Sequence, residues 1–571
     1  MNNQKIADVL YEIANLLDIR GDNFFKTRAY RMAAQKIEVL NENIIDLVKE
    51  KRLSDIEGIG KALTEKISEL ALTGKLKYLE DLKSEIPESL LEMLKISSLG
   101  PKKVSALYNE LDIKTIDELK DACKKGIVRD LEGFGEITEK KILRGIKMRE
   151  KTSGRVFINI ASEDADEYIS YLKSYKNIIR LSIAGSLRRR KETIGDLDIL
   201  VSSNNPDEVM DYFVKYDRVK SVLMKGSTKT SVILDDNVQV DLRVVEDKSF
   251  GSALQYFTGS KEHNVKMRSI AIKKGFKLNE YGLFDKKTEK IIIGKEEADI
   301  YKKLGLSYIE PELRENHSEV DSASKNLLPN LITQSDIKGD LHVHSNYSDG
   351  SEKIEDMVKV AVEMGYEYIG FADHSQSLRV ANGLNFNRVK KKKSEIDKIQ
   401  KKYPQIKIFC STECDILKDG SLDYDDKILE FFDYVVIGIH TKFLMDKKEI
   451  TNRIIKGMEN KYSSILAHPT CRIIGYREPF DLDIEKILDS AKDTGTYMEI
   501  NSFPDRLDLN DLHSKMAKDR GVKIAINTDA HQLDQLSYIK YGISNARRGW
   551  LEKNDVLNTK NLKEINKIFG L

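Results

Sequence analysis

The spacing of hydrophobic and polar residues changes along the chain and divides it into regions. Over residues 1 to about 150, apolar residues recur every three or four positions, as in IADVLYEIANLLDI (6–19), which predicts an all-helical region. From about 155, strand-like runs such as RLSIAG (180–185) and VQVDLRVV (238–245) alternate with helical segments, which predicts a mixed α/β unit. The polar, irregular stretch 317–336 predicts a linker, so we expect a separate domain from about residue 337.

The last region contains apolar runs at the intervals of strand-helix repeats. These runs are DLHVH (340–344), YIGFAD (368–373), IKIFCSTE (406–413), YVVIGIH (434–440), SSILAH (463–468), TYMEIN (496–501) and VKIAINTD (522–529). Such a series predicts a parallel barrel with helices outside. Ionisable residues stand at the carboxyl ends of these runs, which is the face where barrels of this type carry their chemistry.

Composition and charge narrow the class of protein. A chain of 571 residues is too long for one core and predicts several domains, while its net charge of only +1 means that any DNA-binding surface must be local. The sequence has neither an apolar run near 18 residues nor a start typical of a signal peptide, so we expect a cytoplasmic, monomeric protein without membrane contact. The four cysteines lack a C-x-x-C spacing, so we expect buried, reduced thiols.

A short glycine pattern recurs three times in the helical region, as IEGIG (56–60), ISSLG (96–100) and LEGFG (131–135), and a helical pattern follows each time. A single such glycine commonly serves only to join helices. The repeated pattern resembles the helix-hairpin-helix motif, which binds DNA phosphates through backbone N–H groups, often with a monovalent cation, without reading bases. The resemblance implies DNA contacts at Gly58, Gly60, Gly100, Gly133 and Gly135.

Three aspartates form the clearest chemical signal of the first half. In GDLDIL (195–200), Asp196 and Asp198 alternate on one strand and therefore share a face, and Asp241 could come from a neighbouring strand. Converging carboxylates stay ionised when divalent cations compensate them, which is the two-metal arrangement of phosphoryl transfer. The alternative is a solvated acidic strand face.

The motifs of residues 1 to about 318 resemble the family X DNA polymerases. GS (185–186) followed by GDLDIL is similar to the nucleotidyltransferase signature, KGSTKT (225–230) to a palm segment near DNA, and YFTGSKEHNVKMRSIAIKKGFKLNEYGLF (256–284) to the thumb. The resemblance implies an α+β palm and thumb in which Mg²⁺ or Mn²⁺ binds Asp196, Asp198 and Asp241, with Asp241 helping to activate the primer 3'-hydroxyl.

The same resemblance implies roles in nucleotide binding. Ser186, Arg189 and Gly195 would hold the dNTP triphosphate, whereas Tyr256, Phe257 and Gly259 would shape the sugar pocket. Asn264 and Arg268 would contact the nascent base pair and the template strand. Arg190 departs from the family, which commonly has glycine there, and this puts the local loop geometry in doubt.

The amino-terminal segment resembles the small domain of this family, which binds the 5'-phosphate of a DNA gap. Lys26 and Tyr30 would lie near that phosphate, and Lys66 occupies the position of the Schiff-base lysine that removes deoxyribose phosphate. By default, however, a lysine in TEKISEL is only a solvated helix residue.

The two histidines of HVH (342–344) introduce a set of motifs that resembles the PHP domain, a distorted (β/α)7-type phosphoesterase barrel at the carboxyl end of bacterial family X polymerases. HVH, SDGS, ADHS, STECD, GIH, AHP and TDAH occur in the order of its metal motifs. The resemblance implies one metal held by His342, His344, Glu413 and Asp529, a second held by Glu413, His440 and His468, and a third held by Asp349, His374 and His531. Imidazoles and carboxylates suit Mn²⁺ or Zn²⁺.

These resemblances predict a multidomain α/β enzyme. The expected segments are a lyase-like domain (1–80), helix-hairpin-helix fingers (81–150), a palm (151–248), a thumb (249–318), a linker (319–336) and a PHP domain (337–571). We expect a template-directed gap-filling polymerase of base excision repair, acting on gapped or nicked double-stranded DNA. The PHP domain would be a metal-dependent 3'-5' exonuclease, with AP-endonuclease activity as a further option; the alternatives are a structural module or a small-molecule phosphatase.

Overall fold

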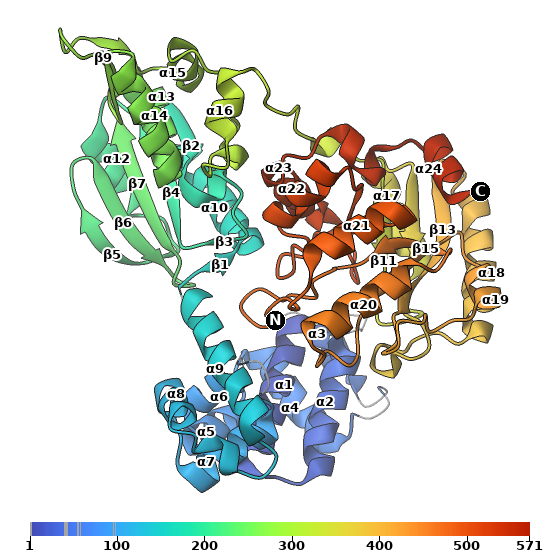
Figure 1. The fold of residues 1–571 in the computed structure, drawn as a ribbon. Coiled ribbons are helices and arrows are strands. Elements are labelled where there is room, and N and C mark those ends of the chain that lie inside the picture. The colour runs from blue at the N-terminus through green and yellow to red at the C-terminus, as the bar shows by residue number, and fades with distance from the viewer. Residues whose placement is uncertain are drawn as a thin grey trace. The chain divides into compact units, whose positions relative to one another are not determined.

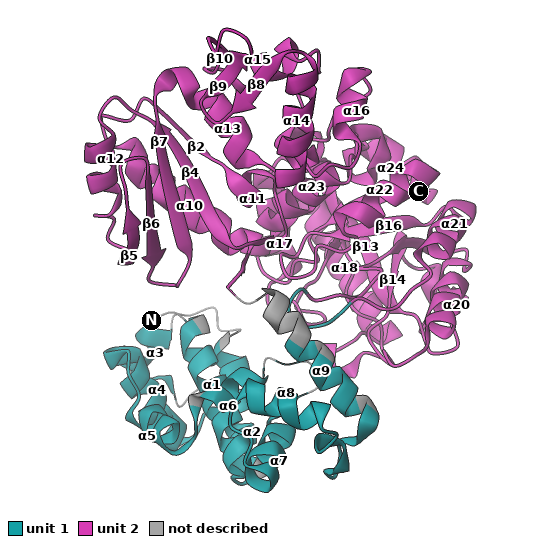
Figure 2. Cartoon of the chain, turned by 60° about the vertical axis from the view of Figure 1, so that its left-hand side comes forward, with its two compact units in different colours: residues 1–153, 474–478 teal, residues 154–473, 479–571 magenta. Residues whose placement is uncertain are grey.

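A computed structural model of the chain describes residues 3–38, 44–53, 56, 59–94, 96, 99–152 and 154–571. The chain forms two compact units, which Figure 2 shows in different colours. Unit 1 comprises Met1–Ser153 together with Ile474–Glu478, and unit 2 comprises Gly154–Ile473 together with Pro479–Leu571.

The described residues of unit 1 before residue 153 form helices joined by turns, as the apolar periodicity predicts. Its helices are α1 (Asn3–Arg20), α2 (Phe24–Glu38), α3 (Ile44–Lys49), α4 (Lys61–Thr73), α5 (Lys77–Glu85), α6 (Glu88–Leu94), α7 (Pro101–Leu111), α8 (Ile116–Lys124) and α9 (Gly135–Thr152). The apolar side of α1 is formed by Ile6, Leu10, Ile13 and Leu17, which are fully buried against the neighbouring helices.

The first part of unit 2 contains a five-stranded sheet in the order β2-β4-β7-β6-β5, whose strands lie side by side in Figure 1. Its elements are β1 (Val156–Phe157), α10 (Ile158–Lys173), β2 (Arg180–Ile183), α11 (Gly185–Arg188), β3 (Thr193–Ile194), β4 (Asp196–Ser202), α12 (Pro206–Phe213), β5 (Val219–Lys225), β6 (Lys229–Leu234) and β7 (Gln239–Val245). β4 and β7 run parallel, while the other pairs of the five-stranded sheet are antiparallel.

The next part packs helices against a small antiparallel sheet. It contains α13 (Phe250–Thr258), α14 (Lys261–Lys273), β8 (Phe276–Asn279), β9 (Gly282–Asp285), β10 (Ile291–Ile293), α15 (Glu297–Lys303) and α16 (Glu319–Ser324). Glu297 is buried between Arg188 of α11 and Arg314, whose side chain is fully buried. Burial alone would raise the pKa of Glu297, but these two guanidinium groups lower it to about 2, so an ionised network joins α11 to the thumb-like part.

The segment 319–336 differs from the irregular linker that its polarity predicts. It begins with α16, and the carboxylate of Glu319 is fully buried, 2.7 Å from Nδ1 of His263 on α14. Val320 and Leu331 join the hydrophobic cluster of the thumb-like part. Glu319 is therefore the partner of a buried group, which sequence polarity alone does not distinguish from the exposed polar residues of the same segment.

The carboxyl-terminal part forms the expected parallel barrel, with the strand order β11 to β17 following the sequence order. The strands are β11 (Gly339–Val343), β12 (Tyr368–Phe371), β13 (Lys407–Asp415), β14 (Tyr434–Gly438), β15 (Ser463–Leu466), β16 (Tyr497–Asn501) and β17 (Ile524–Asn527). The helices are α17 (Ile354–Glu363), α18 (Phe386–Lys402), α19 (Asp426–Leu429), α20 (Lys447–Met458), α21 (Ile484–Thr494), α22 (Asp511–Arg520), α23 (Ile539–Arg548) and α24 (Leu562–Phe569). A parallel bridge between Val343 and Ala530 nearly closes the circle.

Apolar side chains fill the amino-terminal end of this barrel. Tyr368 and Tyr434, each the first residue of its strand, belong to a buried cluster with Phe409, and Phe569 of α24 stacks on Tyr434 with ring centroids 4.5 Å apart. The polar strand ends therefore lie at the opposite, carboxyl-terminal end.

The cysteines and the lengths of the helices bear on two further expectations from the sequence. All four cysteines are free and buried, which confirms the interpretation of the thiols. Within the described residues, no helix combines the length and the apolar character needed to cross a membrane.

Candidate active sites

The three aspartates of the first half meet near the amino-terminal ends of two adjacent inner strands of the palm-like sheet. Asp198 of β4 is paired in register with Asp241 of β7, and Asp196 lies two residues earlier on the same face of β4. One carboxylate oxygen from each residue lies within 4.8 Å of the other two. The pairing of β4 with β7 thus brings together the three residues that the resemblance implies as metal ligands.

The electrostatics of these carboxylates differ from one residue to the next. Burial, followed by the neighbouring charges of Asp196 and Asp241, raises the pKa of Asp198 to about 7. For Asp241 the effect of burial is outweighed by hydrogen bonds, chiefly from Lys229, whose Nζ lies 2.5 Å from Oδ2, so its pKa is lowered. A divalent cation would relieve the repulsion at Asp198, so the donor set fits a metal ion.

A glycine beside the aspartates explains the GS motif. Gly185 has a φ of +60°, and a Cβ atom there would collide with the carboxylate of Asp198. Glycine is therefore required both by the backbone conformation and by the close approach of Asp198. Ser186 follows it in the single turn of α11. Gly195 precedes β4, where an added Cβ would lie 3.1 Å from Nη1 of Arg155.

Arg189 and Gly259, both expected at the nucleotide, lie beside each other. The Arg189 guanidinium donates to the carbonyl of Thr258, and its Nε lies 3.0 Å from Oε1 of Glu315. Arg190, where the family commonly has glycine, takes the left-handed conformation with a φ of +57°. This conformation costs a non-glycine residue about 1 kcal/mol, so other contacts of the loop must offset it.

The other residues expected at the nucleotide lie on α13 and α14. The rings of Tyr256 and Phe257 contact each other edge to face, and Asn264 donates to the carbonyl of Tyr256 at 2.7 Å. Arg268 follows Asn264 one turn along α14 and is half-buried. Phe257 also packs under the Arg243 guanidinium, and both line a cavity of about 990 Å³.

The three residues expected near a 5'-phosphate form one cluster in unit 1. Nζ of Lys66 lies 4.3 Å from the ring centroid of Tyr78 and 5.6 Å from that of Tyr30, and Nζ of Lys26 lies 5.5 Å from that of Tyr78. The two tyrosine rings are stacked. Two ammonium groups beside aromatic rings suit a phosphate or a sugar phosphate, and Tyr78 is the member that sequence reasoning missed.

The glycines of the helix-hairpin-helix pattern fall into two classes. Gly60 and Gly100 are the N-cap residues of α4 and α7, with φ values of −78° and −89°, and a Cβ atom at either position would have no other atom within 4 Å. Gly133 and Gly135, before and at the start of α9, have φ values of +81° and +70°, which favour glycine for conformational reasons. Gly58 lies outside the described residues.

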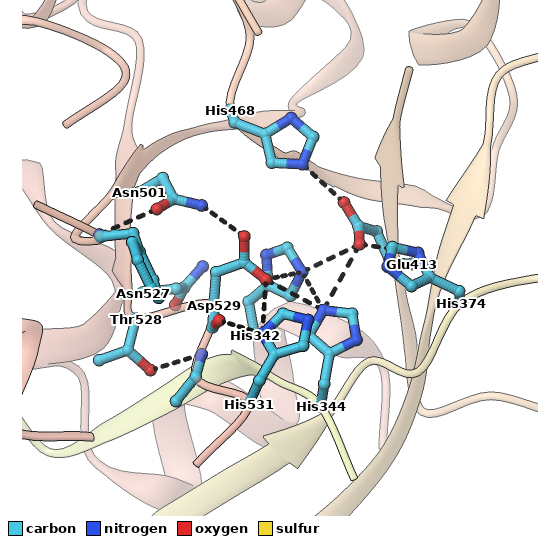
Figure 3. A network of polar contacts seen from close by, with 12 residues as sticks. His342, His344, His374, Glu413, His468, Asn501, Asn527, Thr528, Asp529 and His531 are labelled. Atoms are coloured by element: carbon cyan, nitrogen blue, oxygen red, sulfur yellow. Dashed lines mark hydrogen bonds and ion pairs between the residues drawn. The ribbon is translucent and has the colours of Figure 1, made fainter. Parts of the chain in front are cut away.

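The imidazoles and carboxylates of the barrel converge at the carboxyl ends of its strands, as Figure 3 shows. Ligand atoms from three groups lie within 4.8 Å of one another inside each group: His342, His344, Glu413 and Asp529; His374, Glu413 and His440; and His344, Asp349, His374 and His531. His468, the remaining expected ligand, places Nε2 at 2.8 Å from Oε1 of Glu413. All nine expected ligands thus lie in one cluster around Glu413 and Asp529.

The grouping differs in three details from the one that the resemblance implies, the first being that His468, expected in the second group, belongs to none of the three. His344 belongs to two groups, because its Nε2 lies 3.0 Å from Asp529 while its Nδ1 lies 3.4 Å from Asp349. His374 approaches Glu413 as well as Asp349, at 3.1 and 3.4 Å respectively. The three groups therefore share ligands, which is expected where metal ions lie close together.

Two buried imidazole nitrogens indicate that this site can hold metal ions. His374 Nδ1 and His440 Nε2 lie 3.1 and 3.0 Å from the Glu413 carboxylate, yet neither makes a hydrogen bond to any described residue. A buried imidazole nitrogen without a partner is costly, whereas a metal ion between imidazole and carboxylate would satisfy both. The donor set therefore fits Mn²⁺ or Zn²⁺.

The charges of the cluster oppose the effect of burial. Burial disfavours the imidazolium form of His342, but the carboxylates of Glu499, Glu413 and Asp529 raise its pKa well above the ordinary value. Burial likewise disfavours the carboxylate of Glu413, but the surrounding histidines, chiefly His440, lower its pKa well below the ordinary value. The carboxylates are therefore held in the ionised form that metal ions require.

Two carboxylates that sequence reasoning missed, Glu499 and Asp415, orient expected ligands, and a third, Asp373, stands beside a ligand in the sequence. Oε1 of Glu499 lies 2.8 Å from Nδ1 of His342, and Oδ1 of Asp415 lies 3.2 Å from Nδ1 of His440. Asp373 forms an ion pair with the buried Lys392 and accepts hydrogen bonds from Ser345. Asp415 and Asp373 stand within one or two residues of a ligand in STECD and ADHS, so carboxylates that hydrogen-bond to the ligands could have been sought there.

Family models match several parts of the chain. Residues 1–76 match a helix-hairpin-helix domain, residues 88–148 match a SAM-like helix-hairpin-helix tandem, residues 253–315 match the DNA polymerase beta thumb, and residues 340–503 match the PHP domain. These matches confirm the expected helix-hairpin-helix, thumb and PHP folds.

Relatives of two kinds were found. The DNA polymerase/3'-5' exonuclease PolX of Bacillus subtilis is 40% identical over 567 residues, which cover 99% of both chains. A probable phosphatase of Thermoanaerobacter sp. is 28% identical over 231 residues, which cover 38% of this chain and 89% of the phosphatase. Because the first similarity extends over the whole length and the domain matches agree with it, this chain belongs to the family of the DNA polymerase/3'-5' exonuclease PolX.

Proposed function

We propose that this protein is a template-directed DNA polymerase that fills gaps in damaged DNA and carries a 3'-5' exonuclease in its PHP barrel. The observation that carries the proposal is the presence of two separate ligand clusters in unit 2. One is the carboxylate trio of β4 and β7, and the other is the imidazole-carboxylate cluster of the barrel. Because each cluster is complete within a single chain, we expect the protein to act as a monomer.

In the polymerase site, Asp196, Asp198 and Asp241 would hold two Mg²⁺ or Mn²⁺ ions. Such ions align the primer 3'-hydroxyl with the α-phosphate and neutralise the developing charge. Asp241 would help to accept the hydroxyl proton. Ser186, Arg189 and Gly195 would orient the triphosphate of the incoming dNTP.

Next to the triphosphate, Tyr256, Phe257 and Gly259 would exclude a ribose 2'-hydroxyl. Asn264, fixed by its hydrogen bond to the carbonyl of Tyr256, and Arg268 would contact the nascent base pair and the template strand. Selection of deoxyribonucleotides would thus depend on the end of α13 and the first turns of α14.

In the nuclease site, the nine ligands would hold up to three Mn²⁺ or Zn²⁺ ions. These ions supply an activated water and neutralise the phosphodiester under attack. The chain's own contribution is to fix the ligands: Glu499 and Asp415 orient two imidazoles, and Glu413 lies between the metal groups. Arg506, whose Nε lies 3.8 Å from Oδ2 of Asp529, adds positive charge beside the phosphate position.

In unit 1, the turns that contain Gly60, Gly100, Gly133 and Gly135 would bind DNA phosphates through backbone N–H groups, with a monovalent cation between them. The cluster of Lys26, Tyr30 and Lys66 would bind the 5'-phosphate of a gap. Removal of deoxyribose phosphate would require Lys66 as the Schiff-base nucleophile, which a borohydride trapping assay with Lys66→Ala tests directly.

The test of the proposed function uses a one-nucleotide gap with a 5'-labelled primer. The purified protein is incubated with and without dNTPs, in Mg²⁺ and in Mn²⁺. We expect extension by one templated nucleotide when dNTPs are present and stepwise shortening of the primer when they are absent. Extension without any shortening, in either metal, would leave the barrel with a structural role only.

A further inference from the structure

The loop between α11 and β3 carries a residue of the polymerase site and is contacted by the PHP barrel. It contains Arg189, which in the proposed function orients the triphosphate, and then Arg190, Lys191 and Glu192. Arg190 has a φ of +57°, a backbone conformation that residues other than glycine rarely adopt. The loop contains no glycine that could adopt this conformation without strain, so its shape depends on outside contacts.

Two arginines of the barrel supply such contacts, one at each end of the loop. Nη1 of Arg548, the last residue of α23, donates to the carbonyl oxygen of Arg189 at 2.8 Å. Nη2 of Arg472, from the loop after β15, lies 2.5 Å from Oε1 of Glu192. The Arg548 side chain is only 2% exposed and that of Arg472 only 12% exposed, so both contacts are shielded from water.

Glu315 links Arg548 to the Arg189 side chain. Its Oε1 lies 3.0 Å from Nε of Arg189 and 3.1 Å from Nη1 of Arg548, so the two arginines share one carboxylate oxygen. Asp511 of α22 fixes the other side of the Arg548 guanidinium, with Oδ2 2.5 Å from Nη2. Arg548 thereby contacts both the main chain and, through Glu315, the side chain of Arg189. Figure 2 shows α11 and α23 in the same unit.

We propose that Arg548 is a positioning residue of the polymerase reaction, through which the nuclease barrel sets the conformation of the triphosphate-binding loop. Without Arg548, the carbonyl of Arg189 would lose its side-chain partner from the barrel. Glu315 would then be shared only by Arg189 and by Lys191, whose Nζ lies 3.3 Å from Oε2, so the Arg189 guanidinium would be held more firmly and be less available to a triphosphate. Both effects weaken dNTP binding and leave the aspartate trio intact. The inference rests on the proposed role of Arg189 as a triphosphate ligand.

The test compares Arg548→Ala with Arg547→Ala. Arg547 is a matched control, because it precedes Arg548 on α23 and also reaches the thumb-like part, with Nε 2.8 Å from Oε1 of Glu312. Its other hydrogen bond is donated to the carbonyl of Ile332, away from the loop of Arg189. We expect Arg548→Ala to raise the KM for dNTP in gap filling by about ten-fold, the effect of losing one charge-assisted hydrogen bond. The kcat, the Kd for gapped DNA and the exonuclease rate should match those of Arg547→Ala.

Arg189→Ala separates failure of this inference from failure of the proposed function. If Arg189→Ala leaves the KM for dNTP unchanged, Arg189 is not a triphosphate ligand and the assignment of the polymerase site fails at this residue. If Arg189→Ala raises the KM but Arg548→Ala behaves like Arg547→Ala, the positioning role is overturned. A fall in exonuclease rate equal to the loss of polymerase efficiency would also overturn it, because that pattern indicates general destabilisation.

A second variant keeps the test decisive if Arg548→Ala does not fold. Glu192→Ala removes the palm residue that pairs with Arg472. The Glu192 side chain is 24% exposed and lies outside both ligand clusters. We expect a several-fold rise in the KM for dNTP with an unchanged exonuclease rate. An unchanged KM in this variant would contradict the view that contacts from the barrel set the loop.

Discussion

Asp198 of β4 and Asp241 of β7 face each other in register across two parallel strands. With Asp196 they place three carboxylates within 4.8 Å, although only Lys229 forms an ion pair with one of them among the described residues. Such an arrangement is unfavourable in the metal-free protein and becomes favourable when divalent cations bind. The stability of the palm should therefore depend on the negative charge of Asp198.

Asp198→Asn should raise the thermal stability of the metal-free protein while abolishing extension. Replacing one carboxylate by a neutral amide removes repulsion of the order of 1 kcal/mol, or about 2–4 °C in the unfolding temperature of the palm. The measurement is differential scanning calorimetry in EDTA and again in Mg²⁺. The wild type, but not the variant, should gain stability from Mg²⁺; a variant that is less stable than the wild type in EDTA would contradict the argument.

Gly60→Val should weaken the binding of gapped DNA without disturbing unit 1. The position has an extended φ of −78° and open space for a Cβ atom, so the fold accepts a side chain that would keep a DNA phosphate away. Titration at several salt concentrations should show weaker binding for all base sequences and a salt slope reduced by about 1. Thr64→Val, one turn further along α4, is the control, and equal affinity of the two variants would rule out backbone contacts at Gly60.

Glu499→Gln should weaken metal binding at the nuclease site, although Glu499 is not an expected ligand. It orients His342 through Nδ1, and loss of such an orienting carboxylate typically costs 10- to 100-fold in metal affinity. The readouts are a competition titration of Mn²⁺ against a chelator and the metal content by mass spectrometry. Glu485→Gln, at an exposed position of α21, is the control, and unchanged affinity for all three ions would contradict the role of Glu499.

Glu297→Gln should destabilise the junction of palm and thumb. Glutamine would leave Arg314 buried without a full countercharge, which costs about 3–5 kcal/mol. Because the pKa of Glu297 is lowered in the folded state, to about 2, its stabilisation is present above about pH 4.5 and is lost as the pH falls through that range towards 2. Calorimetry should show a large difference from the wild type at pH 7 that shrinks near pH 3. Glu296→Gln, an exposed neighbour paired with Arg180, should have little effect at either pH.

The local pattern of hydrophobic and polar residues was sufficient to predict the strands that carry the site residues. It was much less sufficient to predict which other residues those site residues contact. The period of two in GDLDIL places Asp196 and Asp198 on one face, and the seven apolar runs after residue 337 correspond to β11–β17. Asp241 is different, because its approach depends on β4 pairing with β7 although β5 and β6 lie between them in sequence. The pattern of VQVDLRVV indicated only that Asp241 could come from a neighbouring strand, and the resemblance to a family assigned it to the metal site.

Contacts between residues that are far apart in the sequence cannot be predicted from the pattern of residues around either one. Arg548 and Arg189 are 359 positions apart, and nothing in the sequence near either residue indicates that a barrel helix binds the polymerase loop. Glu319 lies in a polar stretch that predicts a linker, yet it is buried because His263 requires a partner. Glu499 was recognised as a strand residue, but its role follows from its distance to His342, which depends on the register of β16 in the barrel.

The central claim is that one chain contains two metal-dependent active sites with separate ligands. The most direct measurement follows a labelled one-nucleotide gap, with and without dNTPs, for three proteins: the wild type, Asp196→Ala with Asp198→Ala, and Glu413→Ala. We expect the aspartate double variant to shorten the primer without extending it, and Glu413→Ala to extend it without shortening it, with less bound metal. Loss of both activities in both variants, or full exonuclease activity in Glu413→Ala, would contradict the account.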